Sequence, residues 1–285
     1  MRYFSFYILL FLLVTSCRPD LDYSISGYTQ KIIVEGFIAN GEYPKVYLSL
    51  NIPVSEKVDT ITMLNNVIRW AKVTVSDGIN TEVLTGGWDK KHYPPYVYRG
   101  TELKGEEGKT YSLKVEYSGY TLYSQTTIPF STSIQKFNTS PVEGNDTLRI
   151  LSMTLNIDAS KKNAYRVFSM KKKDGYYIQT QFVYNSEFTL SGNNSFTISP
   201  KPTVMDSSYA EGSYFAKGDT IRVRLCTIDS VSTQFFKALT LFSSSTGVGN
   251  NFFIGEKDAL KSNISSPGFG IWYGNGTTNY TYVIP

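Results

Sequence analysis

The sequence predicts a mainly β protein: an N-terminal immunoglobulin-like β-sandwich, then a second sandwich or barrel-like β domain with one short helix. Short segments rich in Val, Ile, Thr, Tyr and Phe recur along the chain. Gly, Asn, Asp and Pro separate these segments, as turns separate strands. Several of them alternate apolar and polar residues, which is the period of a half-buried strand. Only one stretch has a clear helical period.

The first sixteen residues differ from the rest of the chain. Arg2 precedes an apolar run from Phe4 to Val14, which is far shorter than the roughly 20 residues of a membrane-spanning helix. This pattern predicts a signal peptide at residues 1–16. The segment Val14–Cys17 resembles the lipobox of bacterial lipoproteins, in which the cysteine thiol receives diacylglycerol. We therefore expect cleavage before Cys17 and a lipid on Cys17; an ordinary signal peptide with a chance cysteine is the alternative.

Residues 17–28 are polar and predict a lipidated tether. Residues 29–130 form the first predicted domain, because strands and turns fill about 100 residues, the length of one immunoglobulin-like sandwich. A Cys-Trp-Cys core is missing, which argues against an antibody-type domain. The strands are expected at 31–38, 46–50, 71–76, 111–117 and 122–128.

Residues 131–285 form the second predicted domain, and Ser131–Ser133 begins the linker to it. Its strands are expected at 148–157, 187–190 and 220–228. A hairpin is expected to pair 165–168 with 176–179 around Asp174-Gly175, a strong turn signal, with Lys171–Lys173 at its solvated tip. A helix is expected near 232–242, beginning at Ser232 and packing one apolar stripe on the second sheet: Phe235, Ala238, Leu239 and Phe242.

Composition excludes several kinds of function. The formal charge of +4 falls to +3 without Arg2, too little for a nucleic-acid-binding face. A single histidine, His92, argues against a zinc site. We expect no catalytic residues, metal or cofactor, and Cys226 is expected to be a lone, half-buried thiol. A carboxylate pair needs no local motif, so a hydrolase remains an alternative. The lysine triplet leaves open a contact with anionic lipid or lipopolysaccharide.

Aromatic residues make up 15% of the chain, and the Pro-containing connection Trp88–Tyr98 concentrates them. Flat rings with a polar edge suit a glycan or a peptide and also anchor protein interfaces. The candidate binding residues are Trp88, His92, Tyr93, Trp272 and Tyr273. The alternative is that Tyr96 and Tyr98 begin the next strand and pack inward. The same alternative, packing in the core, applies to Trp272 and Tyr273.

Motifs in a consistent order resemble domain-of-unknown-function family 4249. In the first half they are Ile33–Ile38, Gly108–Val115, Gly119–Tyr123 and Thr127–Pro129; in the second half they are the helix, Asn250–Phe253, Lys261–Ile264 and Gly268–Trp272. The resemblance covers nearly all of the mature chain. Where the family more usually has paired glycines, this chain has Ser265–Gly268. This difference affects the expected geometry of the local loop but not the expected fold.

The resemblance implies an outer-membrane lipoprotein of a kind often encoded beside TonB-dependent receptors, with no catalytic residues assigned. Together with the lipobox it predicts a non-catalytic binding subunit that works with an outer-membrane β-barrel transporter in nutrient capture. The sequence does not decide whether the protein faces the cell surface or the periplasm. A structural, fimbria-like surface protein and a carboxylate-based hydrolase are the rival functions.

Overall fold

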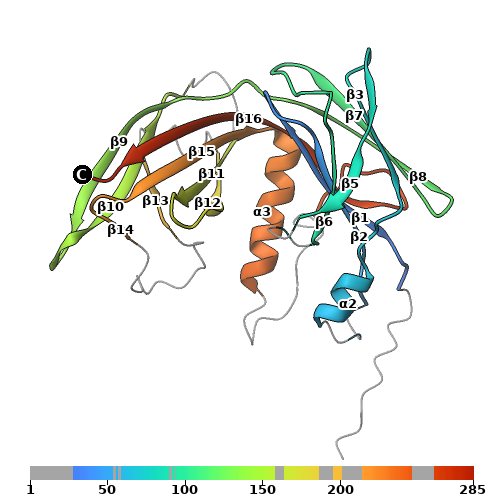
Figure 1. Cartoon of the computed structure of the whole chain (residues 1–285), viewed down its shortest axis with the longest axis horizontal. Coiled ribbons are helices and arrows are strands. Elements are labelled where there is room, and N and C mark those ends of the chain that lie inside the picture. Colours follow the sequence, from blue (N-terminus) through green and yellow to red (C-terminus); the bar gives the residue numbers. More distant parts are fainter. Residues whose placement is uncertain are drawn as a thin grey trace, which may run out of the picture.

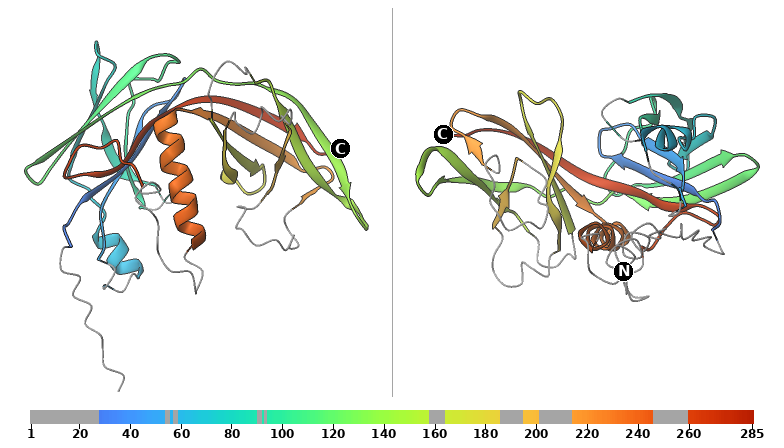
Figure 2. Two further views of the ribbon diagram at one scale, coloured as in Figure 1. Left: turned by 180° about the vertical axis from the view of Figure 1, so that it is seen from behind. Right: turned by 90° about the horizontal axis from the view of Figure 1, so that it is seen from below.

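The structure is a computed structural model that describes residues 28–53, 56, 59–89, 92, 94–157, 164–185, 195–200, 214–245 and 260–285. Within these residues the fold is mainly β, as predicted, and β9, β15 and β16 arch over helix α3 (Figure 1). Seen from below, α3 lies nearly end-on between two groups of strands (Figure 2).

The first half of the chain contains eight strands and one described helix. The predicted strands are present within one or two residues of their expected ends, and β6 is the strand that the alternative reading began at Tyr96. Among the described residues, β4, β5 and the helix were not predicted. The elements are β1 (Ile32–Ala39), β2 (Lys45–Leu50), α2 (Thr60–Asn65), β3 (Lys72–Ser76), β4 (Thr81–Val83), β5 (Thr85–Trp88), β6 (Tyr96–Arg99), β7 (Thr110–Tyr117) and β8 (Tyr120–Thr127).

The second half contains the strands predicted at 148–157 and 220–228, and among its described residues β9, β13, β14 and β16 were not predicted. The hairpin around Asp174-Gly175 is present, whereas the strand predicted at 187–190 lies outside the described residues. The elements are β9 (Ile134–Val142), β10 (Asn145–Leu155), β11 (Ala164–Lys171), β12 (Ile178–Asn185), β13 (Ser195–Ile198), β14 (Phe215–Ala216), β15 (Thr220–Ile228), α3 (Ser230–Ser245) and β16 (Phe269–Val283).

One eight-stranded sheet runs through both halves, in the order β12-β11-β15-β16-β1-β2-β6-β5. The joint is β16, whose first part pairs parallel with β1 and whose second part pairs antiparallel with β15. The sheet therefore crosses the domain boundary predicted at residue 131. Two smaller sheets complete the fold: β4-β3-β7-β8, and β13-β10-β14 with β9 paired to β10.

Each half has its own buried cluster. In the first half Val34, Leu48, Val73 and Leu113 pack between the large sheet and the β4-β3-β7-β8 sheet, which gives the predicted sandwich. In the second half alternate residues of β15 and β10, among them Val223, Leu151 and Met153, belong to one buried cluster. Burial of these alternating positions follows from the pleat, which sends neighbouring side chains to opposite faces.

The predicted helix is present but buries a different face. Asp229, not Ser232, caps it: its carboxylate accepts a hydrogen bond from Ser232 N (2.7 Å). Phe235 is buried as expected, whereas Leu239 is 40% exposed and Phe236 is buried in its place. The predicted stripe was therefore wrong at Leu239, because Phe236 is the side chain that packs with Ile271 and Tyr273 of β16. Ala238 is half-buried, and the side chain of Phe242 lies outside the described residues. Neither described helix is long and apolar enough to cross a membrane.

The linker between the halves packs directly on β16. A side chain at Gly274 would meet the backbone of Thr127 at 2.7 Å, and one at Gly276 would meet Pro129 O. The two glycines therefore allow a backbone-to-backbone approach that no other residue would permit. As a result the linker is held against the shared strand instead of spanning open solvent.

Candidate functional site

The strongest candidate site is the β5–β6 hairpin at the edge of the eight-stranded sheet. β5 is the last strand in the sheet order, and Trp88 pairs with Tyr96 where the hairpin opens. The connection folds back on itself, since Asp89 N donates a hydrogen bond to Pro95 O (2.9 Å). Trp88 thus stands at the point where regular strand pairing ends.

His92 fastens this connection to the sheet. Its ring stacks on Tyr47 with ring centres 3.6 Å apart, and its Nε2 atom lies 3.8 Å from Glu35 Oε1. Burial by itself lowers the pKa of His92, but the Glu35 carboxylate outweighs it, so the pKa is raised above the ordinary value. Because Tyr47 covers the ring and His92 is only partly exposed, its geometry fits a holding role better than the exposed contact we predicted.

A second set of polar contacts holds the same connection. Tyr47 donates its hydroxyl hydrogen to Asp89 Oδ2 (3.2 Å), and Arg99 Nη2 lies 3.6 Å from that oxygen. Burial raises the pKa of Tyr47, and the neighbouring Asp89 carboxylate raises it further. Tyr47 therefore stays protonated and remains a hydrogen-bond donor, which fixes the loop at its first residue.

Trp88 is the exposed element of the hairpin. Its side chain is 60% exposed, and Tyr96 supports it edge-on with ring centres 5.6 Å apart. The guanidinium of Arg69 lies 5.7 Å from the centre of the indole, within the range of a cation–π interaction. We call Arg69, Trp88 and Tyr96 the aromatic surface. It presents a large ring in a fixed orientation.

Sequence reasoning found part of this site. Trp88 was proposed from its local context, and Tyr96 and Tyr98 do begin the next strand, with Tyr98 buried. Arg69 was missed, since nothing in its local sequence places it over a ring nineteen positions later. Tyr47 was missed because it lies in a predicted strand, where a tyrosine is expected simply to pack in the core.

Trp272 and Tyr273 are not surface residues, contrary to their proposed binding role. Trp272 is 0% exposed and donates its indole N–H to Tyr111 O (3.0 Å). Tyr273 is 4% exposed and accepts a hydrogen bond from Arg166 (3.1 Å). Both lie in β16, whose first part is covered on both faces, so the fold leaves neither ring available to a partner.

Two predicted site residues, Cys17 and Tyr93, lie outside the described residues. The lipid site and the middle of the aromatic connection therefore stay predictions. The connection itself is fixed from its two described sides, by Asp89 and by Pro94–Pro95.

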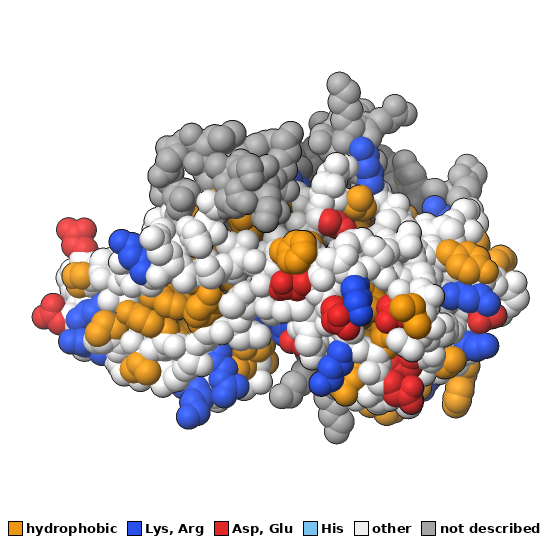
Figure 3. Space-filling view, turned by 90° about the horizontal axis from the view of Figure 1, so that it is seen from above, with side chains coloured by type: hydrophobic (Ala, Val, Ile, Leu, Met, Phe, Trp, Pro, Cys, Tyr) orange, Lys and Arg blue, Asp and Glu red, His pale blue; other side chains and the backbone are white. Residues whose placement is uncertain are grey.

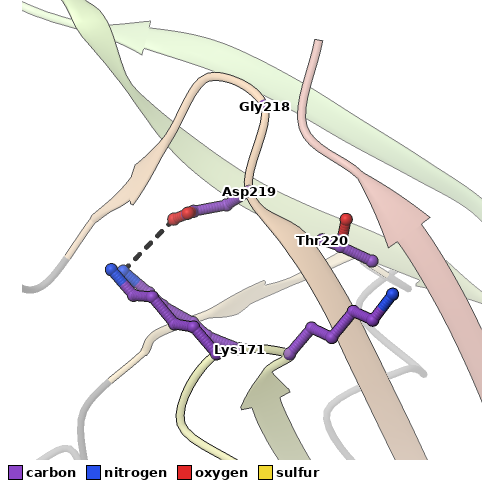
Figure 4. A pocket seen from close by; sticks show the side chains of 6 residues that line it. Lys171, Gly218, Asp219 and Thr220 are labelled. Atoms are coloured by element: carbon purple, nitrogen blue, oxygen red, sulfur yellow. Dashed lines mark ion pairs between the residues drawn. The ribbon is translucent and has the colours of Figure 1, made fainter.

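An open pocket of about 350 Å³ lies at the tip of the β11–β12 hairpin. Lys171 Nζ pairs with Asp219 Oδ2 at 3.3 Å across it (Figure 4). Lys172 and Lys173 are exposed, as expected for the hairpin tip. Asp219 thus offsets one of the three lysine charges at this tip. Its lining residues are Lys171, Lys172, Lys173, Gly218, Asp219 and Thr220.

The one described cysteine, Cys226, is 1% exposed, more deeply buried than the half-buried thiol we expected. Burial raises the pKa of its thiol, although Arg224 and the Thr277 hydroxyl at 3.7 Å act in the other direction. A thiol is reactive as the thiolate, so this position suits packing and not nucleophilic chemistry.

The upper face of the molecule has mixed charge. Lys and Arg side chains are interspersed with Asp and Glu on the upper face (Figure 3). Among the described residues, no group of three or more His, Cys, Asp or Glu side chains is placed to hold a metal ion. The aromatic surface is therefore the feature that best suits a specific contact.

Comparison with family profiles gives a match over nearly the whole chain. The family profile described as "Domain of unknown function (DUF4249)" matches residues 14–280. A search of the curated proteins found no match. Among solved structures, the crystal structure of bovine butyrophilin aligns at 10% identity over 90% of this chain and 100% of that chain. Its TM-score of 0.21 is too low to establish a shared fold.

Proposed function

Because the chain belongs to the family described as a domain of unknown function (DUF4249), whose description assigns no activity, we propose a function from its own residues. The protein is a cell-envelope lipoprotein that acts as a non-catalytic binding subunit. It is held at the outer membrane by lipid on Cys17 and works with an outer-membrane β-barrel transporter in nutrient capture.

The exposed ring of Trp88 is the observation that carries the binding role. Its side chain is 60% exposed although Tyr96 and Arg69 hold it in place. Large aromatic side chains that are fixed before binding lose little conformational entropy on contact, and they are enriched at interface hot spots. The contacts of His92 and Asp89 with Tyr47 hold the connection that follows Trp88.

The membrane attachment is supported by the sequence before the described residues. A short apolar run with a positive residue before it leads to the lipobox Val14–Cys17. A single acyl chain binds a bilayer only marginally, whereas several together anchor a protein stably. A body held in this way needs no membrane-spanning element, and it is free to present the aromatic surface to a neighbour in the same membrane.

The ligand class that fits the aromatic surface is a flat or partly apolar one. An indole with a guanidinium on one face suits the C–H face of a sugar or a peptide side chain, and equally a loop of the transporter. A glycan or a peptide is thus the proposed cargo, and a β-barrel transporter is the proposed partner.

Affinity purification of the lipidated full-length protein from native membranes tests this function. We expect an outer-membrane β-barrel to copurify with the wild type and to be lost with Trp88→Ala, by about 30-fold, which corresponds to the roughly 2 kcal/mol of a hot spot. Tyr123→Ala is the matched control, because Tyr123 is also a surface aromatic residue (56% exposed) but lies in β8. Absence of any β-barrel above background, or equal recovery with both variants, contradicts the proposal.

A further inference from the structure

Three large apolar side chains are exposed within the short segment Asp59–Trp70, which we call the α2 segment. They are Ile61 (70% exposed), Leu64 (38%) and Trp70 (88%). Helix α2 has the sequence TITMLN, which carries no charge, and none of its residues is buried. Ile61 and Leu64 are three positions apart on the helix and so lie on the same face. This helix therefore presents its apolar side chains outward and not to the core.

The α2 segment projects from the end of the sheet at which the described chain begins. Leu50 N donates to Asn66 O (2.8 Å) and Ile68 N donates to Leu48 O (3.0 Å). The end of the α2 segment is therefore held beside the end of β2. Leu50 pairs with Ile32, the first residue of β1. The base of the α2 segment and the start of β1 are thus direct neighbours.

The residues before β1 are fastened to the same place. Tyr28 donates its hydroxyl hydrogen to Asn51 O (2.8 Å), and Lys31 N donates to Asn51 Oδ1 (2.7 Å). Asn51 in turn donates its side-chain N–H to Thr29 O (3.2 Å). Tyr28, at which the described chain begins, is therefore held beside the base of the α2 segment. Figure 1 shows α2 projecting beyond the lower ends of β1 and β2, on the side to which α3 also points.

We propose that the α2 segment is a second membrane contact, which rests on the bilayer with Ile61 and Leu64 among the lipid head groups and Trp70 at the interface. This inference rests on the proposed lipidation of Cys17. Cys17 lies eleven residues before Tyr28, and an extended chain spans at most about 3.3–3.6 Å per residue, so the anchor lies within about 40 Å of Tyr28. Of the described chain, the residue closest in sequence to the anchor is thus Tyr28, beside the α2 segment, and in this proposal that end of the body faces the bilayer.

The chemistry of the segment fits a lipid surface better than a charged one. An uncharged helix loses no charge hydration when it enters the head-group region, and Trp is enriched at that depth. Glu56, Asp59, Lys31 and Arg69 surround it with both signs of charge and are exposed. The contact is therefore apolar and depends little on salt or on the charge of the lipid. Because the tether keeps the segment close to the bilayer, even a weak apolar contact is populated.

Depth-dependent quenching on vesicles tests this contact. The lipidated variant Ile61→Cys is labelled with a fluorophore and reconstituted into phosphatidylcholine vesicles that contain a lipid with brominated acyl chains. Labelling is specific, because Cys17 carries the lipid and Cys226 is buried. The control is the lipidated variant Ile79→Cys, since Ile79 is 91% exposed and lies in the turn at the far end of β3.

We expect quenching at position 61 to exceed quenching at position 79 by about twofold or more, and to persist at high salt. Flotation of the same samples is scored in parallel. If the protein floats and the two positions are quenched equally, the α2 contact is overturned and the lipid anchor stands. If the protein does not float with the vesicles, the lipid anchor itself fails, and the α2 contact fails with it.

Discussion

At the scale of single residues, Trp88 and Trp272 show how differently the fold treats two aromatic residues of the same type. The first is 60% exposed beside a hairpin edge, and the second is 0% exposed and hydrogen-bonded to Tyr111 O. We expect Trp272→Ala to lower the free energy of unfolding by about 3–5 kcal/mol, and Trp88→Ala to change it by about 0.5 kcal/mol or less. Denaturant unfolding curves of the two variants measure both values. Comparable losses in the two would contradict the placement of Trp88.

His92 links stability to pH at the same scale. Burial disfavours its protonated form, but Glu35 outweighs burial and raises the pKa of His92 in the folded state. The stabilisation from the His92–Glu35 pair is fully present at pH values below the unfolded-state pKa of about 6.5. It is lost as the pH rises through the higher pKa of the folded state. We therefore expect the wild type to exceed His92→Gln in stability by more at pH 5.5 than at pH 8.5. A difference that is constant or grows with pH would show that Glu35 does not hold the imidazolium.

At the scale of secondary-structure elements, the structure and the sequence-based prediction differ on which face of α3 is buried. Phe236 lies 3.7 Å beneath the guanidinium of Arg166 and edge-on to Tyr273 at 5.0 Å, whereas the predicted stripe residue Leu239 is 40% exposed. Phe236→Ala should cost about 3–5 kcal/mol of stability, and Leu239→Ala about 0.5 kcal/mol or less. Thermal melts of the two variants show which of the two side chains is buried. A larger loss of stability in Leu239→Ala than in Phe236→Ala would support the apolar stripe expected from sequence.

The elements that sequence could predict are those whose pattern is local. β15 occupies Thr220–Ile228 as expected, because Ile221, Val223 and Leu225 alternate strictly and all three are buried. β16 was not predicted, since its glycines, asparagines and threonines are typical of turns. What makes it a strand is contact with distant elements: β1 on one side, β15 on the other, and the linker lying against Gly274 and Gly276.

The candidate site divides in the same way. Trp88 was predictable because an aromatic residue before a Pro-containing connection is visible in the sequence itself. The residues that hold Trp88 and its connection are distant in sequence. Arg69 comes from the segment before β3. His92 is held by Glu35 of β1 and Tyr47 of β2. A single sequence carries no signal for such contacts, because they depend on which strands become neighbours.

At the scale of the whole molecule, the buried clusters of the two halves are joined by more than a linker. β16 contributes Trp272 to the first cluster and supports the second through Tyr280 and Tyr282. Arg224 of β15 pairs with Glu42, which follows β1, at 2.6 Å. We therefore expect a single unfolding transition in calorimetry, with equal calorimetric and van't Hoff enthalpies. Two resolved transitions would show that the halves are stable independently, as the boundary at residue 131 predicted.

The parallel pairing of β1 with β16 also concerns the order in which the protein is made. A ribosome completes β1 more than two hundred residues before it reaches β16, so the first strand waits for nearly the whole chain before it gains its neighbour on that side. Contacts so far apart in sequence form slowly, because a long loop must close first. The large sheet is therefore complete only when synthesis has passed β16, and a premature stop codon anywhere before residue 269 removes the strand that both halves share.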